Sequence, residues 1–123
     1  IVNAQVQIEI SKSDFLFLSS LIDGCGAVIN EAFMVGTRVL CSSNCGAADL
    51  IKDGRGMIFN YENNDFAEKL SLMLQKGKMS DFEKEKIKVW SSNNITGNSA
   101  ATYFLKIIEH VYNNGKKPTA PWS

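Results

Sequence analysis

A short glycine-containing turn holds the residue types best suited to bind a charged ligand. It comprises Asp23, Gly24, Cys25, Gly26 and Ala27, and it lies between an apolar stretch and a segment of good helix formers. Glycine lets a ligand approach the backbone closely, and unpaired N–H groups at the start of a helix attract anions. The turn therefore predicts an anion site, although a tight turn also needs glycine when it binds nothing.

Two carboxylates, Asp23 and Glu31, flank this turn. Glu31 follows Gly26 by about 7.5 Å if the intervening residues are helical, at about 1.5 Å per residue. A ligand whose phosphate lies at the helix start would present different hydroxyls to the two carboxylates, which are strong charged acceptors. The structural alternative is that Asp23 only shapes the turn and that Glu31 is a solvated helix residue.

The segments around the turn alternate between strand-like and helix-like patterns. Four apolar residues at 15–18, bounded by polar residues, predict a strand that is buried on both faces. Gly36 is expected to end the helix that follows the turn. That helix is predicted at residues 27–35. After it, a strand is predicted at 39–41, one helical turn at 47–51 and another strand at 57–59.

The second half of the chain is predicted to be helical, and the secondary structure of the N-terminal segment is ambiguous. Helices are predicted from a cap at Asn64 or Asp65, over 79–90 and over 98–112. The apolar stripe of the last helix comprises Ala101, Phe104, Leu105, Ile108, Val111 and Tyr112. Residues 5–12 fit either an edge strand or the end of a helix, and both alternatives stay open.

This order of elements predicts the α/β class, as a partial Rossmann-like parallel sheet with helices on both faces. We expect a partial nucleotide-binding domain over residues 1–113, and a tail or linker over 114–123, where both prolines lie. A complete doubly wound sheet usually has about five or six strands, so we expect the missing strands to precede Ile1. In such sheets ligands bind at the carboxyl ends of the strands, where the glycine-containing turn lies.

Composition narrows the classes of function. The 123 residues contain 13 Lys and Arg against 13 Asp and Glu, so net charge gives no reason to expect a nucleic-acid partner. One histidine and three cysteines argue against a multi-histidine metal site and most zinc frameworks. The odd cysteine count indicates a reducing compartment, and we expect a cytoplasmic location.

Five sequence blocks then carry a resemblance to a known family. They are an Asp-led apolar strand ending in Ser-Ser, Asp-Gly-Cys-Gly with a glutamate eight residues after the aspartate, Glu-Ala-Phe-Met-Val-Gly, a serine-led loop and Asp-Gly-Arg-Gly. They occupy residues 14–20, 23–31, 31–40, 42–51 and 53–57. In order and spacing they resemble the C-terminal donor-binding domain of the group 1 retaining glycosyltransferases of the GT-B fold, over residues 6–113.

The resemblance implies a role for each residue of the turn. Asp23 would be the catalytic candidate that contacts hydroxyls of the transferred sugar, and backbone N–H groups from Cys25 to Ala27 would hold the diphosphate. Glu31 would bind the nucleotide ribose. No metal and no cofactor beyond the nucleotide-sugar donor would be needed, because fixed dipoles stabilise the leaving group.

Some positions depart from the family pattern. Asp23 stands where the family has a longer glutamate, Cys25 and Cys45 replace Phe and Gly, and Arg38 replaces Pro. The family's diphosphate-binding Arg and Lys and its acceptor-binding N-terminal domain have no counterpart in the chain. We therefore expect a glycosyltransferase fragment that cannot transfer sugar alone.

The whole protein would transfer a sugar from a nucleotide-sugar donor, with retention, to an acceptor that the residues do not identify. It would lie in the cytoplasm, with membrane association at the inner face through the missing domain left open. Two alternatives are a sugar-nucleotide epimerase of the same fold and a non-catalytic binding module.

Overall fold

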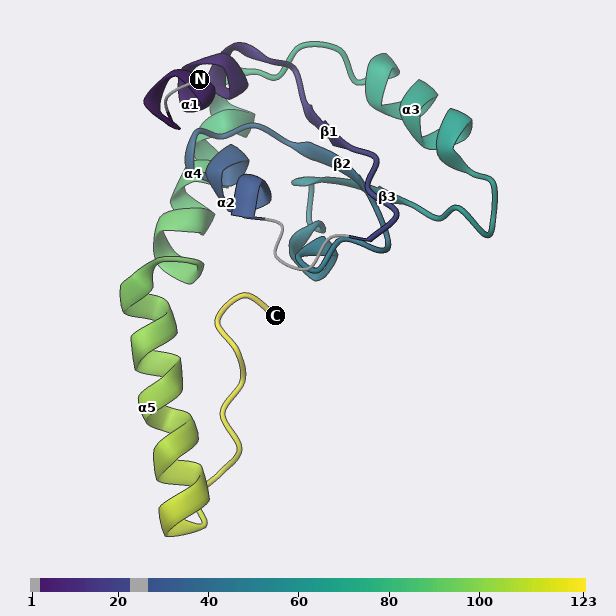
Figure 1. Cartoon of the computed structure of the whole chain (residues 1–123). Coiled ribbons are helices and arrows are strands. Elements are labelled where there is room, and N and C mark those ends of the chain that lie inside the picture. Colours follow the sequence, from purple (N-terminus) through teal and green to yellow (C-terminus); the bar gives the residue numbers. More distant parts are fainter. Residues whose placement is uncertain (1–2, 23–26) are drawn as a thin grey trace.

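Residues 3–22 and 27–123 are described by a computed structural model, in which the sheet has three parallel strands (Figure 1). The strands lie side by side in the order β1 (Leu16–Leu18), β2 (Val39–Ser42) and β3 (Gly56–Phe59). The register pairs Leu18 with Cys41, and Ser42 with Phe59. The carboxyl ends of the strands therefore meet along one edge of the sheet, which we call the carboxyl edge.

One face of the sheet carries the larger core. There Val39 and Cys41 pack with α1 (Asn3–Lys12), α2 (Ala27–Met34) and α4 (Asp81–Asn94). Ile29 and Phe33 of α2 are fully buried in this core. The ring of Phe33 meets the ring of Trp90 edge-on, with the centroids 5.9 Å apart.

The opposite face of the sheet is covered by α3 (Phe66–Gln75). Leu40 and Phe59 point to this side, because successive strand residues alternate between faces, and they pack against Met73. Helices on both faces of a parallel sheet confirm the predicted α/β class and its Rossmann-like character. The short connection between β2 and β3 contains one turn of 3₁₀ helix, η1 (Ala48–Leu50), as the sequence predicted.

The N-terminal segment, which the sequence left open, is helical. Val6, Ile8 and Ile10 alternate along this segment. Val6 and Ile10 are four residues apart, and this spacing places both side chains on one face of a helix. Ile10 is buried and Val6 packs against the same core, while Ile8 is exposed. Thr37 Oγ1 also donates a hydrogen bond to the Ile10 carbonyl at 2.8 Å. Packing against the core therefore decided between strand and helix.

The prediction that the first strand is buried on both faces is wrong. β1 pairs with β2 alone in the described sheet, and its central residue Phe17 is 41 % exposed. The ring of Phe17 still stacks on Phe66 of α3, with the centroids 5.4 Å apart. The strand buried on both faces is β2, because it has a strand on each side and helices on each face.

The predicted end of α2 is confirmed, whereas the predicted bounds of α4 and the predicted cap of α3 differ from the structure. Gly36 has a positive φ of 78° and closes the turn after α2, as predicted. Helix α4 begins at Asp81 and ends at Asn94, and not at 79 and 90 as predicted. A capping box sets its start: Ser80 Oγ accepts from the Glu83 N–H, and the Glu83 carboxylate accepts from the Ser80 N–H. Asp65 precedes α3, but its carboxylate accepts from the Asn60 N–H at 2.7 Å instead of capping the helix.

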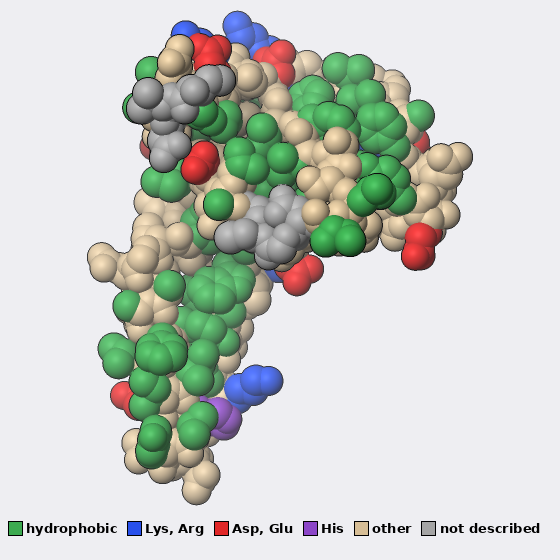
Figure 2. Space-filling view, viewed as in Figure 1, with side chains coloured by type: hydrophobic (Ala, Val, Ile, Leu, Met, Phe, Trp, Pro, Cys, Tyr) green, Lys and Arg blue, Asp and Glu red, His purple; other side chains and the backbone are tan. Residues whose placement is uncertain are grey.

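The last helix, α5 (Gly97–Asn113), extends away from the sheet, and the tail returns along it (Figure 1). Its apolar stripe is present, but Phe104, Val111 and Tyr112 are more than half exposed. Figure 2 shows the hydrophobic side chains gathered along this helix. Within residues 3–22 and 27–123, no helix is both long enough and apolar enough to cross a lipid bilayer.

The close approach of β3 to β2 generates a stability prediction. A Cβ atom at Gly56 would overlap the backbone carbonyl of Val39, whereas one at Gly54 would meet nothing within 4 Å. Both glycines have positive φ. We expect Gly56→Ala to lower the free energy of unfolding by about 3 kcal/mol and Gly54→Ala by about 1 kcal/mol, as measured by urea denaturation. Equal losses would show that backbone strain, and not the overlap, governs both sites.

Candidate functional site

The segment after β1 is fixed from both of the other strands. The Ser42 hydroxyl, at the end of β2, donates to the Ser20 carbonyl at 2.6 Å. The Tyr61 hydroxyl, just beyond β3, donates to the Ser19 carbonyl. Both bonds lie at the carboxyl edge, and together they hold the backbone that leads toward the predicted anion-binding turn.

Four of the predicted site residues, Asp23, Gly24, Cys25 and Gly26, lie outside the described residues. Ala27 is described, and it is the exposed first residue of α2. The helix therefore begins at the residue that the sequence predicted, Ala27. The partial positive charge of a helix start, about half an elementary charge, is thus placed just after β1 along the chain.

Glu31 lies one turn further along α2, on the same helix face as Ala27, because residues four apart share a face. It is half-buried, and its neighbour Ala32 is fully buried in the core. Among the described residues, Glu31 forms no ion pair. The helix thus holds the Glu31 carboxylate half-buried on the face that also carries Ala27.

The loop after β2 supplies packing at this edge. Cys45, which departs from the family pattern, is buried, and its N–H donates to the Ser42 carbonyl at 3.2 Å. Its sulfur lies 3.8 Å from Ser42 Oγ. Ala48, at the start of η1, donates its N–H to the Cys45 carbonyl. Cys45 therefore belongs to the core, and its thiol supports the serine that ties β2 to β1.

The two arginines of the chain lie at the opposite, amino edge of the sheet. Arg38 precedes β2, is buried, and donates to the carbonyls of Asp14, at 3.2 Å, and of Gly77. Because β2 runs away from it, Arg38 is not placed to neutralise a ligand at the carboxyl edge.

Arg55 precedes β3 and is also used within the fold. Its guanidinium lies 3.6 Å from the centre of the Trp90 ring, and its Nε donates to the Leu50 carbonyl at 3.0 Å. Asp53 lies 3.8 Å from the same guanidinium. Burial lowers the pKa of Arg55, and the carboxylate of Asp53 opposes that shift in part. Arg55 thus stiffens the start of β3.

Tyr61 carries no recognisable signal in the sequence, and Ser42 stands out there only as the start of the serine-led loop. Tyr61 and Ser42 act on carbonyls at positions 19 and 20, which are distant along the chain. Within the described residues, no three His, Cys, Asp or Glu side chains gather into a group that would hold a metal ion. The described part of the site therefore consists of a helix start, one carboxylate and an ordered backbone.

Comparison with known families connects this geometry to a function class. The family described as glycosyl transferases group 1 matches residues 2–90, which is more than half of the chain. No curated protein matches the chain. The matched segment contains all three described strands, α2 with Glu31, and both arginines. A parallel sheet with the family's blocks in the family's order leads to one conclusion: this chain belongs to the group 1 glycosyltransferase family.

Proposed function

We propose that this chain is the donor-binding part of a retaining glycosyltransferase that uses a nucleotide sugar. Membership of the family supports glycosyl transfer in general. The single observation that carries the finer proposal is the position of Glu31. It is half-buried one turn into α2, on the face of the exposed helix start, with no ion-pair partner among the described residues.

In this proposal the donor lies with its diphosphate at the start of α2. The N–H groups from Cys25 to Ala27 would hold the diphosphate, and Glu31 would accept from the ribose hydroxyls. Asp23 would contact the transferred sugar. For the residues before Ala27 the support is the sequence pattern, since they lie outside the described part of the chain.

The charge balance of the site implies a contribution from elsewhere. A nucleoside diphosphate carries about two or three negative charges, against about half a positive charge from a helix start. Both arginines are buried at the amino edge and engaged with backbone carbonyls. We therefore propose that cations from another domain, which also binds the acceptor, complete the site. A cytoplasmic location, at the inner face of a membrane through that domain, stays a prediction.

The ribose contact is tested by Glu31→Gln in the whole transferase. Losing one charge-assisted hydrogen bond removes about 1.5–3 kcal/mol, so donor affinity should fall about 10- to 150-fold. Calorimetric titration with uridine- and guanosine-diphosphate sugars measures this. Glu85→Gln, an exposed carboxylate on α4, is the matched control and should bind as the wild type does. A donor affinity of Glu31→Gln within twofold of the wild type contradicts the assignment.

The anion site is tested by Gly26→Val, which adds a branched side chain where the phosphate would approach the backbone. We expect binding of the nucleoside diphosphate to be lost in the whole transferase, as measured by calorimetry, while the circular dichroism spectrum is kept. Unchanged binding would place the anion site elsewhere.

The incomplete charge balance predicts the behaviour of residues 1–123 alone. We expect this chain to bind nucleotide sugars more weakly than micromolar and to transfer no sugar, because Arg38 and Arg55 serve the fold. Titration of the isolated chain with several nucleotide sugars, followed by a transfer assay, checks both points. Micromolar binding, or any transfer, would show that the chain holds a complete site.

A further inference from the structure

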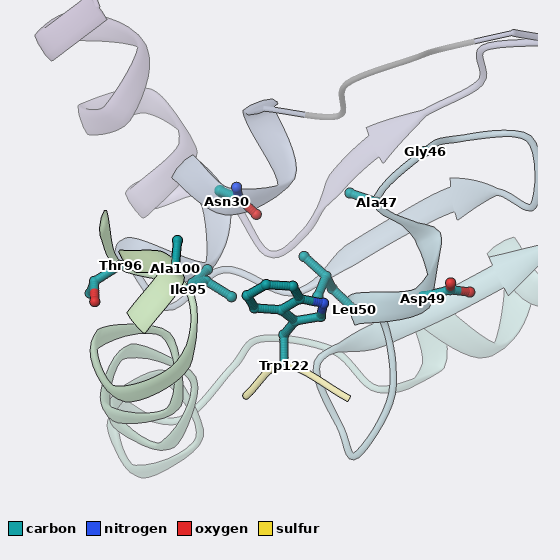
Figure 3. A pocket seen from close by; sticks show the side chains of 9 residues that line it. All are labelled: Asn30, Gly46, Ala47, Asp49, Leu50, Ile95, Thr96, Ala100 and Trp122. Atoms are coloured by element: carbon teal, nitrogen blue, oxygen red, sulfur yellow. The ribbon is translucent and has the colours of Figure 1, made fainter. Parts of the chain in front are cut away.

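A cavity of about 360 Å³ lies beside α2, and Asn30, but not Glu31, is among the residues that line it. Four segments that are distant in sequence form it: α2, the loop after β2, the junction of α4 with α5, and the C-terminal tail (Figure 3). Its volume is at the lower end of the range of about 300–1,000 Å³ typical of ligand sites. Its larger apolar lining residues are Leu50, Ile95 and Trp122.

One polar atom points into this cavity without a partner. Asn30 Oδ1 is buried and accepts no hydrogen bond from the described residues. Figure 3 shows this amide oxygen turned toward the space above the Trp122 indole. A buried acceptor without a donor is costly and uncommon in native structures. The position of Asn30 therefore indicates a ligand group that donates a hydrogen bond there.

Trp122 forms an aromatic wall of the same cavity, although it is the second-last residue of the chain. The tail that carries it is held against α5. His110 Nδ1 lies 2.5 Å from the Gly115 carbonyl, and the Trp122 ring meets the Tyr103 ring with the centroids 5.1 Å apart. The indole is thus positioned by the fold and presents a flat apolar surface next to Asn30 (Figure 3).

The charges around the cavity select the class of ligand. Among the described residues that line it there is no Lys or Arg, so nothing there would neutralise a phosphate. Asp49 is the one charged side chain among the described lining residues, and its carboxylate points away from the indole in Figure 3. The ligand should therefore be neutral, bear hydrogen-bond donors and have an apolar face.

We propose that this cavity binds a neutral pyranose ring, as one unit of a saccharide, independently of the donor site. A ring hydroxyl donates to Asn30 Oδ1, and the C–H face of the sugar lies on the Trp122 indole. The remaining hydroxyls face the opening. A flat nucleobase is disfavoured because Leu50 and Ile95, which lie on either side of the indole in Figure 3, are aliphatic and offer no second ring to stack on.

Nuclear magnetic resonance of the 123-residue chain tests this proposal through its two tryptophans. Each indole N–H gives one signal, and Trp122→Phe assigns them. The probes are the methyl glycosides of glucose, galactose, mannose and N-acetylglucosamine, with uridine and inorganic phosphate as comparisons. At least one glycoside should shift the Trp122 signal saturably. The Trp90 signal should stay in place, since that ring lies against Arg55.

Two variants separate the proposed contacts from a general effect on folding. Asn30→Leu keeps a similar shape without the acceptor and should weaken glycoside binding at least fivefold, whereas Asn63→Leu, at an exposed turn residue, should not. The Trp122 side chain lies outside both core clusters. Trp122→Ala should therefore abolish glycoside binding and leave the midpoint of thermal unfolding unchanged. This variant remains informative if Asn30→Leu fails to fold.

Each contrary result overturns the proposal. No shift of the Trp122 signal by any glycoside would show that the cavity holds only water. A shift by uridine or phosphate alone would assign the cavity to another ligand class. Glycoside binding that survives both Asn30→Leu and Trp122→Ala would place the sugar elsewhere on the chain.

Discussion

The rest of the structure depends on the pairing of the buried central strand β2 with a parallel strand on each side. Val39, Leu40 and Cys41 of β2 are fully buried, so this strand needs helices on both faces. Parallel neighbours also require connections that cross over the sheet, and α2 provides the one from β1 to β2. The close contact at Gly56 then brings β3 into register. The carboxyl edge, with the candidate site, follows from this arrangement.

The two edges of the sheet carry different polar side chains, with the arginines at the amino edge and hydroxyl groups at the carboxyl edge. At the amino edge, Arg38 and Arg55 are buried, and they donate to the backbone carbonyls of Asp14, Gly77 and Leu50. At the carboxyl edge, the hydroxyls of Ser42 and Tyr61 order the backbone that leads to the start of α2. Cations that stabilise the fold are thus kept apart from the edge where an anionic donor is proposed to bind. This separation explains why we expect cations from outside the chain to complete the site.

Helix α5 extends away from the sheet, and the tail that follows it returns along the helix (Figure 1). The helix leaves its apolar stripe exposed. The tail returns along the helix and brings Trp122 close to Asn30 on α2 and to the loop after β2 (Figure 3). Glu31 is not among the residues that line this cavity, and neighbouring residues on a helix point in directions about 100° apart. One short helix can therefore serve two sites, with Glu31 on one face and Asn30 on another.

The sequence by itself determined the class of the fold, the family and several local elements. Glycine at position 36, with its positive φ, and the apolar stretches of β2 and β3 are local signals, and local signals survive in any tertiary context. The spacing of blocks over residues 14–59 identified the family, which the match to residues 2–90 confirmed. The roles of Asp23 to Ala27 and of Glu31 stay predictions, and Asp23 to Gly26 lie outside the described part of the chain.

Only the tertiary structure decided the features that depend on partners far along the chain. Residues 5–12 became a helix because Val6 and Ile10 found the core, and β1 stayed partly exposed because it has one neighbouring strand in the described sheet. The burial of both arginines, and the meeting of Asn30 with Trp122 across about ninety residues, have no local signature either. The physical reason is that burial and hydrogen-bond partners are properties of packed surfaces, which short sequence patterns do not specify.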